Sequence, residues 1–161
     1  MKINLFVEDL QKAITKAEKV MMKKATMPIL ENIKLTAQRK EITVTANNLE
    51  SEVHINIDGE VEKEGTVLIN SDSFKLIQKL SGKIHMILED NILKILSKRD
   101  LKLKCDNVEC FPEDNRLEIN NPAFLIEANE FKAMTKIKIA SAQDDIRPIL
   151  KSICIHNNLA W

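Results

Sequence analysis

Two hydrophobic periodicities alternate along the chain, and their order restricts the fold more than any other feature. Between residues 8 and 22 the apolar side chains recur at helical spacing, at Leu10, Ala13, Ile14, Ala17 and Met21. Pro28 ends any helical continuation. Through residues 33–57 apolar and polar residues then alternate strictly. This pattern predicts one helix followed by half-buried strands of an antiparallel sheet.

The same order then restarts. Residues 66–70 are predicted as a strand, Ser71 as a helix N-cap and residues 72–80 as a short helix. Three more strands are expected at residues 83–90, 91–98 and 101–106. A strand, a helix and three strands therefore occur twice, which predicts an α+β fold with helices on one face of antiparallel sheets.

A domain-scale repeat follows. Met27–Leu35 matches Arg147–Ile155, including a shared Pro-Ile-Leu, at an offset of 120 residues. The expected organisation is a first domain at 1–112, a linker rich in Pro and Asn at 113–122, and a second domain at 123–161. The second copy reaches Trp161 after one strand, so we expect it to be truncated.

Composition excludes several classes of protein. Lys plus Arg and Asp plus Glu both number 24, so any contact with nucleic acid has to come from a local basic face. The three glycines form no phosphate-binding loop, and no nucleophile pair or metal-ligand spacing is present. We therefore expect no cofactor, no metal and no catalysis. The three cysteines show no paired spacing, and no signal peptide or membrane span is evident, which favours a cytoplasmic protein.

Lysines gather on the predicted helices. Lys12, Lys16, Lys19 and Lys23 fall within an arc of roughly 60° on a wheel of about 100° per residue, opposite the apolar stripe. Two further pairs stand at i, i+4 spacing, Lys75 with Lys79 and Lys132 with Lys136. Such faces suit sequence-independent contact with phosphates, although a solvated helix surface has the same composition.

Four segments carry a family resemblance, and their order and spacing are more specific than any one of them: Thr26–Ile33, Ala46–Val53, Phe111–Asp114 and Asp145–Leu150. Together they resemble the bacterial DNA polymerase III beta subunits, the sliding clamps. The resemblance implies the DNA clamp fold and a non-catalytic processivity factor for DNA replication. In that family three such domains make a subunit, and two subunits close a ring that encircles duplex DNA and tethers the polymerase. The clamp loader is the other implied partner.

The resemblance also assigns roles to individual residues. Lys24, in the loop after the first helix, matches a basic residue that touches DNA. Gln143 and Arg147 lie in the matching loop of the second domain, where the neighbouring Asp144 is a poor phosphate partner. Leu150 matches one wall of the peptide-binding pocket for polymerases.

Two alternatives stay open at this point. The chain could be an adaptor or decoy that pairs with a full clamp subunit, or a metal-dependent enzyme acting on nucleic acid. The enzyme would need acids converging from several strands, and the sequence offers only the pairs Glu50 with Glu52 and Asp144 with Asp145.

Assembly is the last expectation. The ring-closing surface of the first domain is placed at Ser73–Leu80 and Leu101–Asn107. Because a third domain is lacking, we expect a monomer or a loose dimer rather than a closed ring.

Overall fold

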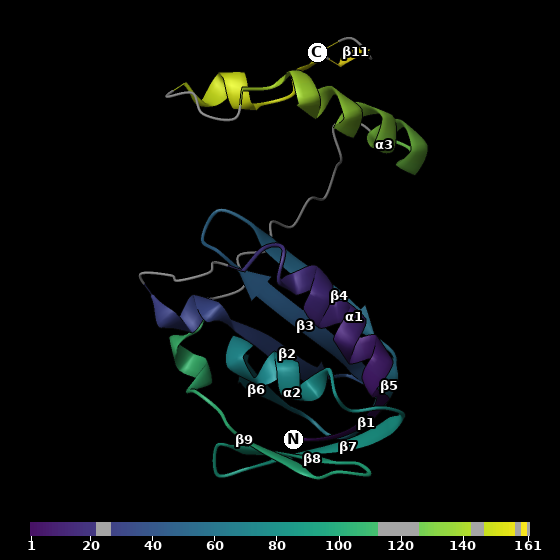
Figure 1. The fold of residues 1–161 in the computed structure, drawn as a ribbon, viewed down its shortest axis with the longest axis vertical. Helices are drawn as coiled ribbons and strands as arrows, with labels where there is room; N and C mark the ends of the chain where they lie inside the picture. The colour runs from purple at the N-terminus through teal and green to yellow at the C-terminus, as the bar shows by residue number, and fades with distance from the viewer. Residues whose placement is uncertain (22–26, 113–125, 143–146, 157–158, 161) are drawn as a thin grey trace. The chain divides into compact units, whose positions relative to one another are not determined.

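The computed structural model describes residues 1–21, 27–112, 126–142, 147–156 and 159–160. The chain divides into two compact units, Met1–Asp114 and Asn115–Trp161. Figure 1 shows both units as ribbons.

The first unit contains two antiparallel sheets. The five-stranded sheet has the order β5-β1-β7-β8-β9 and the four-stranded sheet the order β4-β3-β2-β6. The strands of the first are β5 (Gly59–Lys63), β1 (Lys2–Phe6), β7 (Lys83–Glu89), β8 (Ile92–Leu96) and β9 (Leu101–Lys104). Those of the second are β4 (Glu52–Ile57), β3 (Glu41–Asn47), β2 (Asn32–Gln38) and β6 (Gly65–Asn70).

The two sequence repeats exchange their first strands. β1 precedes α1 (Val7–Ala17) in the chain but pairs with β7, which belongs to the second repeat. β6 precedes α2 (Phe74–Ile77) but pairs with β2 of the first repeat. The predicted strand–helix–three-strand units and the α+β class are confirmed, and the exchange interlocks them into one body.

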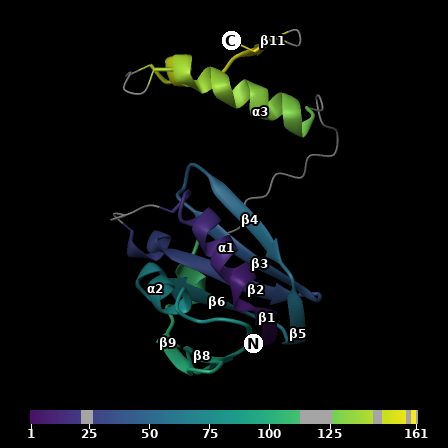
Figure 2. The same cartoon turned by 45° about the vertical axis from the view of Figure 1, so that its right-hand side comes forward.

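Both helices lie side by side against the four-stranded sheet (Figures 1 and 2). α1 buries four residues of the predicted stripe together with Val7, whereas Met21 lies beyond the helix and is partly buried. The buried residues of α1 are Val7, Leu10, Ala13, Ile14 and Ala17. Phe74 and Ile77 are the buried residues of α2. They join alternate residues of both sheets in one hydrophobic core, and burial of this apolar surface is the main force holding the unit together.

Three sequence expectations need correction, and one strand was missed. α1 ends at Ala17 rather than near residue 22, and one further turn follows it through the Met21 amide, which donates to the Ala17 carbonyl at 3.1 Å. Asn70, not Ser71, caps the second helical segment, because its side chain accepts a hydrogen bond from the Asp72 amide. The predicted helix 72–80 is a 3₁₀ turn, η2 (Ser71–Ser73), followed by the short α2. β5 was not predicted, since its only apolar side chain is Val61.

Three turns adopt left-handed backbone without glycine. The β2–β3 turn has positive φ at Arg39 (51°) and Lys40 (70°), and the β7–β8 turn has it at Asp90 (47°) and Asn91 (61°). Two consecutive residues of this kind match the right-handed twist of a hairpin. Before β4, the Asn47 side chain accepts from the amide of Leu49, whose φ is 71°.

The last described residues of the first unit close the outer face of the four-stranded sheet. After η3 (Val108–Cys110), the Phe111 side chain is buried, and the Lys34 ammonium of β2 lies 5.1 Å from its ring centroid. This cation–π contact joins the segment that resembles the end of the first clamp domain to the sheet.

The second unit is described in less detail. It contains α3 (Ala128–Ile137), the short 3₁₀ helices η4 (Lys138–Ala140) and η5 (Pro148–Lys151), and a two-stranded pair of β10 (Ile155–His156) and β11 (Leu159–Ala160). The N-terminus of α3 carries a capping box, in which Glu127 and Glu130 each bind the other's backbone amide. Its first turn is therefore well satisfied.

Candidate nucleic-acid interface

The exposed side of α1 is basic. Lys12 and Lys16 lie on the helix and Lys19 in the turn that follows, and all three are exposed. On a wheel of about 100° per residue they stand opposite the buried stripe, as the sequence predicted. This side of the helix therefore presents ammonium groups to solvent over more than one turn.

The exposed side of α2 is also basic. Lys75 and Lys79 are exposed, while Phe74 and Ile77 on the other side are buried. Two hydrogen bonds join the helices, because the Gln11 side-chain amide donates to the carbonyl oxygens of Ile77 and Leu80, each at 3.1 Å. We call the five exposed lysines of these helical segments the helix face: Lys12, Lys16, Lys19, Lys75 and Lys79.

Acidic groups on α1 reduce the charge of the helix face only in part. The Lys12 ammonium lies 3.1 Å from Asp9, an exposed ion pair that the lysine arc alone did not reveal. Glu8 is directed elsewhere, because its carboxylate accepts a hydrogen bond from the Gly82 amide at 2.8 Å. That hydrogen bond lowers the pKa of Glu8. Within the described residues, Lys16, Lys19, Lys75 and Lys79 form no ion pair.

The other predicted DNA contacts are divided between the second unit and undescribed positions. Lys132 and Lys136 are exposed on α3, and Arg147 is exposed just before η5. Three further predicted contacts, Lys23, Lys24 and Gln143, lie outside the described residues.

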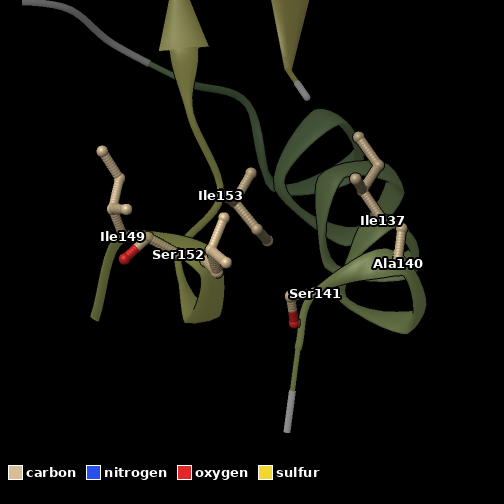
Figure 3. Close-up of a pocket in the computed structure, with 7 residues that line it drawn as sticks. Ile137, Ala140, Ser141, Ile149, Ser152 and Ile153 are labelled. Carbon is tan, nitrogen blue, oxygen red and sulfur yellow. The ribbon is translucent and has the colours of Figure 1, made fainter. Parts of the chain in front are cut away.

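A hollow of about 160 Å³ lies in the second unit beside Leu150 (Figure 3). It is lined by Ile137, Ala140, Ser141, Ile149, Leu150, Ser152 and Ile153. Leu150 is 40% exposed and Ile149 78% exposed, so apolar side chains border an open depression. The position expected for a wall of the peptide pocket thus lies in an apolar surface hollow.

An enzymatic arrangement is not found among the described side chains. No group of three His, Cys, Asp or Glu residues there could hold a metal ion. Of the acid pair Glu50 and Glu52 that the sequence offered, only Glu52 lies on β4, because Glu50 lies in the turn before it.

One cluster resembles a nucleophile triad superficially. The His54 ring lies 3.1 Å from the Thr45 hydroxyl and 3.6 Å from the Glu52 carboxylate. Thr45 is only 2% exposed, so its hydroxyl is shielded from a substrate. The cluster fits a cross-strand packing role on β3 and β4.

Comparison with known families decides the classification. Residues 1–117 match the model for the N-terminal domain of the DNA polymerase III beta subunit. The chain belongs to this family. The family predicted from the four sequence segments is thereby confirmed. No curated protein sequence matches the chain.

Solved sliding clamps share the fold. The chain is similar to the Bartonella birtlesii clamp bound to griselimycin, with a TM-score of 0.87 and 22% identity over 97% of this chain and 43% of that one. A putative DNA polymerase III beta subunit from Eubacterium rectale has a TM-score of 0.83 and 21% sequence identity over 95% of this chain and 43% of that one. The Helicobacter pylori beta clamp bound to a DNA ligase peptide has a TM-score of 0.80 and 23% sequence identity over 95% of this chain and 44% of that one.

These comparisons confirm the clamp fold, and the chain spans less than half the length of each of these clamps. Within the described part of the chain, no helix is long and apolar enough to cross a membrane.

Proposed function

We propose that this chain supplies a DNA-facing part of a sliding clamp, with the helix face directed at the phosphate backbone of duplex DNA. The observation that supports the proposal is that α1 and α2, joined by the Gln11 hydrogen bonds, both carry exposed lysines. The family relationship makes DNA the natural partner for that surface.

Lysine suits a contact that must slide. Its ammonium is a compact charge on a flexible stem, which neutralises phosphate without fixing a geometry. Contacts to phosphate carry no sequence information, so the protein can hold any duplex. In a complete ring this surface would line the hole, and the ring would raise the effective concentration of the polymerase at the primer end. No bond is made or broken in this role.

Peptide partners are part of the proposal. The Helicobacter pylori clamp was solved with a DNA ligase peptide. The apolar hollow beside Leu150 is the corresponding candidate surface in this chain, and replicative polymerase and clamp loader are its proposed users.

The test is a comparison of two triple variants in duplex DNA binding, measured by fluorescence anisotropy across a salt series. One variant carries Lys16→Gln, Lys75→Gln and Lys79→Gln. The control carries Lys40→Gln, Lys63→Gln and Lys98→Gln, which remove three exposed lysines outside the helices. The parent should bind weakly, with a Kd of about 10⁻⁴ M or weaker at physiological salt.

The helix-face variant should bind more weakly still, and the slope of log K against log salt should fall by about one for each phosphate that the protein no longer neutralises. The control should retain the parent's slope. Equal weakening in both variants would show that binding reflects total charge, and an unchanged helix-face variant would refute the proposal.

A further inference from the structure

The outer face of the five-stranded sheet carries a row of lysines. Lys2 of β1 is in register with Ile87 of β7, Ile87 with Lys94 of β8, and Lys94 with Lys102 of β9. Directly opposed residues on neighbouring antiparallel strands point to the same side of the sheet. Lys104 follows one step further along β9, in register with Ile92. Lys2, Lys94, Lys102 and Lys104 are called the sheet stripe.

The sheet stripe is electrostatically unfavourable for folding alone. Like charges directly opposite one another destabilise a strand pair, and Lys94 and Lys102 are so placed. Lysines on edge strands protect against aggregation, which accounts for Lys102 and Lys104 on the edge strand β9. Protection of an edge does not account for Lys2 and Lys94, because β1 and β8 are interior strands.

Acidic side chains compensate the charge of the sheet stripe only in part. Glu89 lies 2.6 Å from Lys94, and this pairing lowers the pKa of Glu89. Glu89 also acts electrostatically on Lys2, whereas no carboxylate among the described residues lies within ion-pair distance of Lys102 or Lys104. The other acids of this face sit at the opposite edge, where Glu62 accepts from the Asn4 side-chain amide and Glu60 pairs with Lys83.

Apolar side chains are interspersed with these lysines. Ile92 is 41% exposed and Leu96 38% exposed, and Ile87 is half-buried between Lys2 and Lys94. A phosphate backbone would gain nothing from such side chains, whereas a peptide with apolar residues between its carboxylates would bury them. The mixture therefore favours protein over nucleic acid as the partner.

We infer that the outer face of the five-stranded sheet is a docking surface for an acidic segment of a partner protein, one whose carboxylates alternate with large apolar side chains. Its carboxylates pair with the sheet stripe and its apolar side chains cover Ile87, Ile92 and Leu96. This surface is separate from the helix face, because its side chains point away from the core that α1 and α2 cover. The protein thus has a second binding surface, which takes a protein segment, whereas the helix face takes DNA.

The experiment uses the full chain and two labelled probes. One probe is a synthetic peptide in which Glu alternates with Leu and Phe, and the other is duplex DNA. Two double variants are compared, Lys94→Gln with Lys102→Gln on the sheet stripe and Lys16→Gln with Lys79→Gln on the helix face. A second peptide of the same length and charge, with Ser in place of Leu and Phe, reports the apolar contribution.

The sheet-stripe variant should bind the Glu-Leu-Phe peptide roughly tenfold more weakly, a change of about 1.4 kcal/mol, and should bind DNA as the parent does. The helix-face variant should show the reverse pattern. The sheet-stripe variant removes the opposed Lys94–Lys102 charges together with the exposed Lys94–Glu89 ion pair, so it should melt close to the parent, and this checks that its fold is intact.

Three results would overturn the inference. They are equal binding of the peptide by the parent and the sheet-stripe variant, weakened DNA binding rather than peptide binding in that variant, and equal affinity for the Ser-containing peptide. The second would assign the face to nucleic acid, and the third would reduce it to non-specific charge attraction.

Discussion

The side-chain amide of Gln11 donates a hydrogen bond to the carbonyl oxygen of Ile77 at 3.1 Å. A second bond of the same length reaches the Leu80 carbonyl, so one side chain of α1 serves two carbonyls at the C-terminal end of α2. The pair fixes the helices relative to one another, and with them the spacing of the lysines that α1 and α2 present.

Gln11→Ala should lower the free energy of unfolding by about 1–2 kcal/mol, because two partly buried carbonyls are deprived of their donor. Gln78→Ala is the control, since Gln78 is exposed just after α2 and its side chain has no hydrogen bond within the described residues. It should cost less than about 0.5 kcal/mol. Urea denaturation measures both, and equal costs would mean that the Gln11 bonds add nothing.

Gly59→Ala should destabilise the protein by about 1–3 kcal/mol through overpacking. A Cβ at this position would lie 2.6 Å from Cδ1 of Ile42 and 2.7 Å from the Asn4 carbonyl oxygen. Adding Ile42→Val removes the first clash and leaves the second, so the double variant should recover only part of the stability. Full recovery would show that the backbone contact with Asn4 is easily relieved.

Gly82→Ala provides a contrasting case. No atom lies within 4 Å of a Cβ built there, but the φ of Gly82 is +81°, a conformation that costs an L-residue about 1 kcal/mol. The thermal midpoint should therefore fall although no neighbouring atom is crowded. The thermal midpoint of Gly82→Asn should fall less than that of Gly82→Ala, because asparagine tolerates left-handed backbone.

Acid stability should depend on Glu8. The hydrogen bond from the Gly82 amide lowers the pKa of this carboxyl in the folded protein. A lowered folded pKa means that the contribution is present above the ordinary glutamate pKa of about 4.3 and is lost as the pH falls through the folded value. Glu8→Gln keeps an acceptor and removes the titration, so denaturation midpoints measured from pH 6 to pH 2 should fall less steeply than in the parent. Glu18→Gln, at an exposed glutamate just after α1 whose side chain accepts no hydrogen bond among the described residues, is the control variant.

The three cysteines should separate by reactivity. Cys110 and Cys154 are exposed, whereas Cys105 is buried and burial raises the pKa of its thiol. Because the thiolate is the reactive form, Cys105 should be modified last by a disulfide reagent, and at the rate of the others only in denaturant. Single Cys→Ser variants assign each phase. A fast phase that disappears in Cys105→Ser would contradict the burial of this side chain.

Much of the fold followed from the sequence where apolar periodicity was strong. Four of the five buried residues of α1 were predicted, because their burial is local and regular. β5 was not predicted, because it has a single apolar residue among Glu60, Glu62 and Lys63. It is held in the sheet by pairing with β1, about 56 positions away in the chain. The exchange of first strands between the repeats was equally invisible, since periodicity marks strands but does not say which of them pair.

The candidate site was predicted unevenly for the same reason. The exposure of Lys12 and Lys16 followed from helix geometry. The ion pair of Lys12 with Asp9 was missed, because Asp9 lies one turn before Lys12 and the prediction counted only the lysines. The sheet stripe was not predicted, because its members become neighbours only through the register of four strands. Lys94 and Lys102 are eight positions apart in the chain and directly opposed in the sheet.

The position of β1 also has a consequence during synthesis. β1 lies between β5 and β7, so its two neighbours are the segments Gly59–Lys63 and Lys83–Glu89. As the chain leaves the ribosome, this first strand has neither partner until those segments have followed it. The β2–β3 and β3–β4 hairpins have local contacts, so they can form before β1 is paired on both sides. β1 is thus made before both of its partners, and in pulse-labelled nascent chains the amides that it directs at β7 should be protected only after β7 has been made.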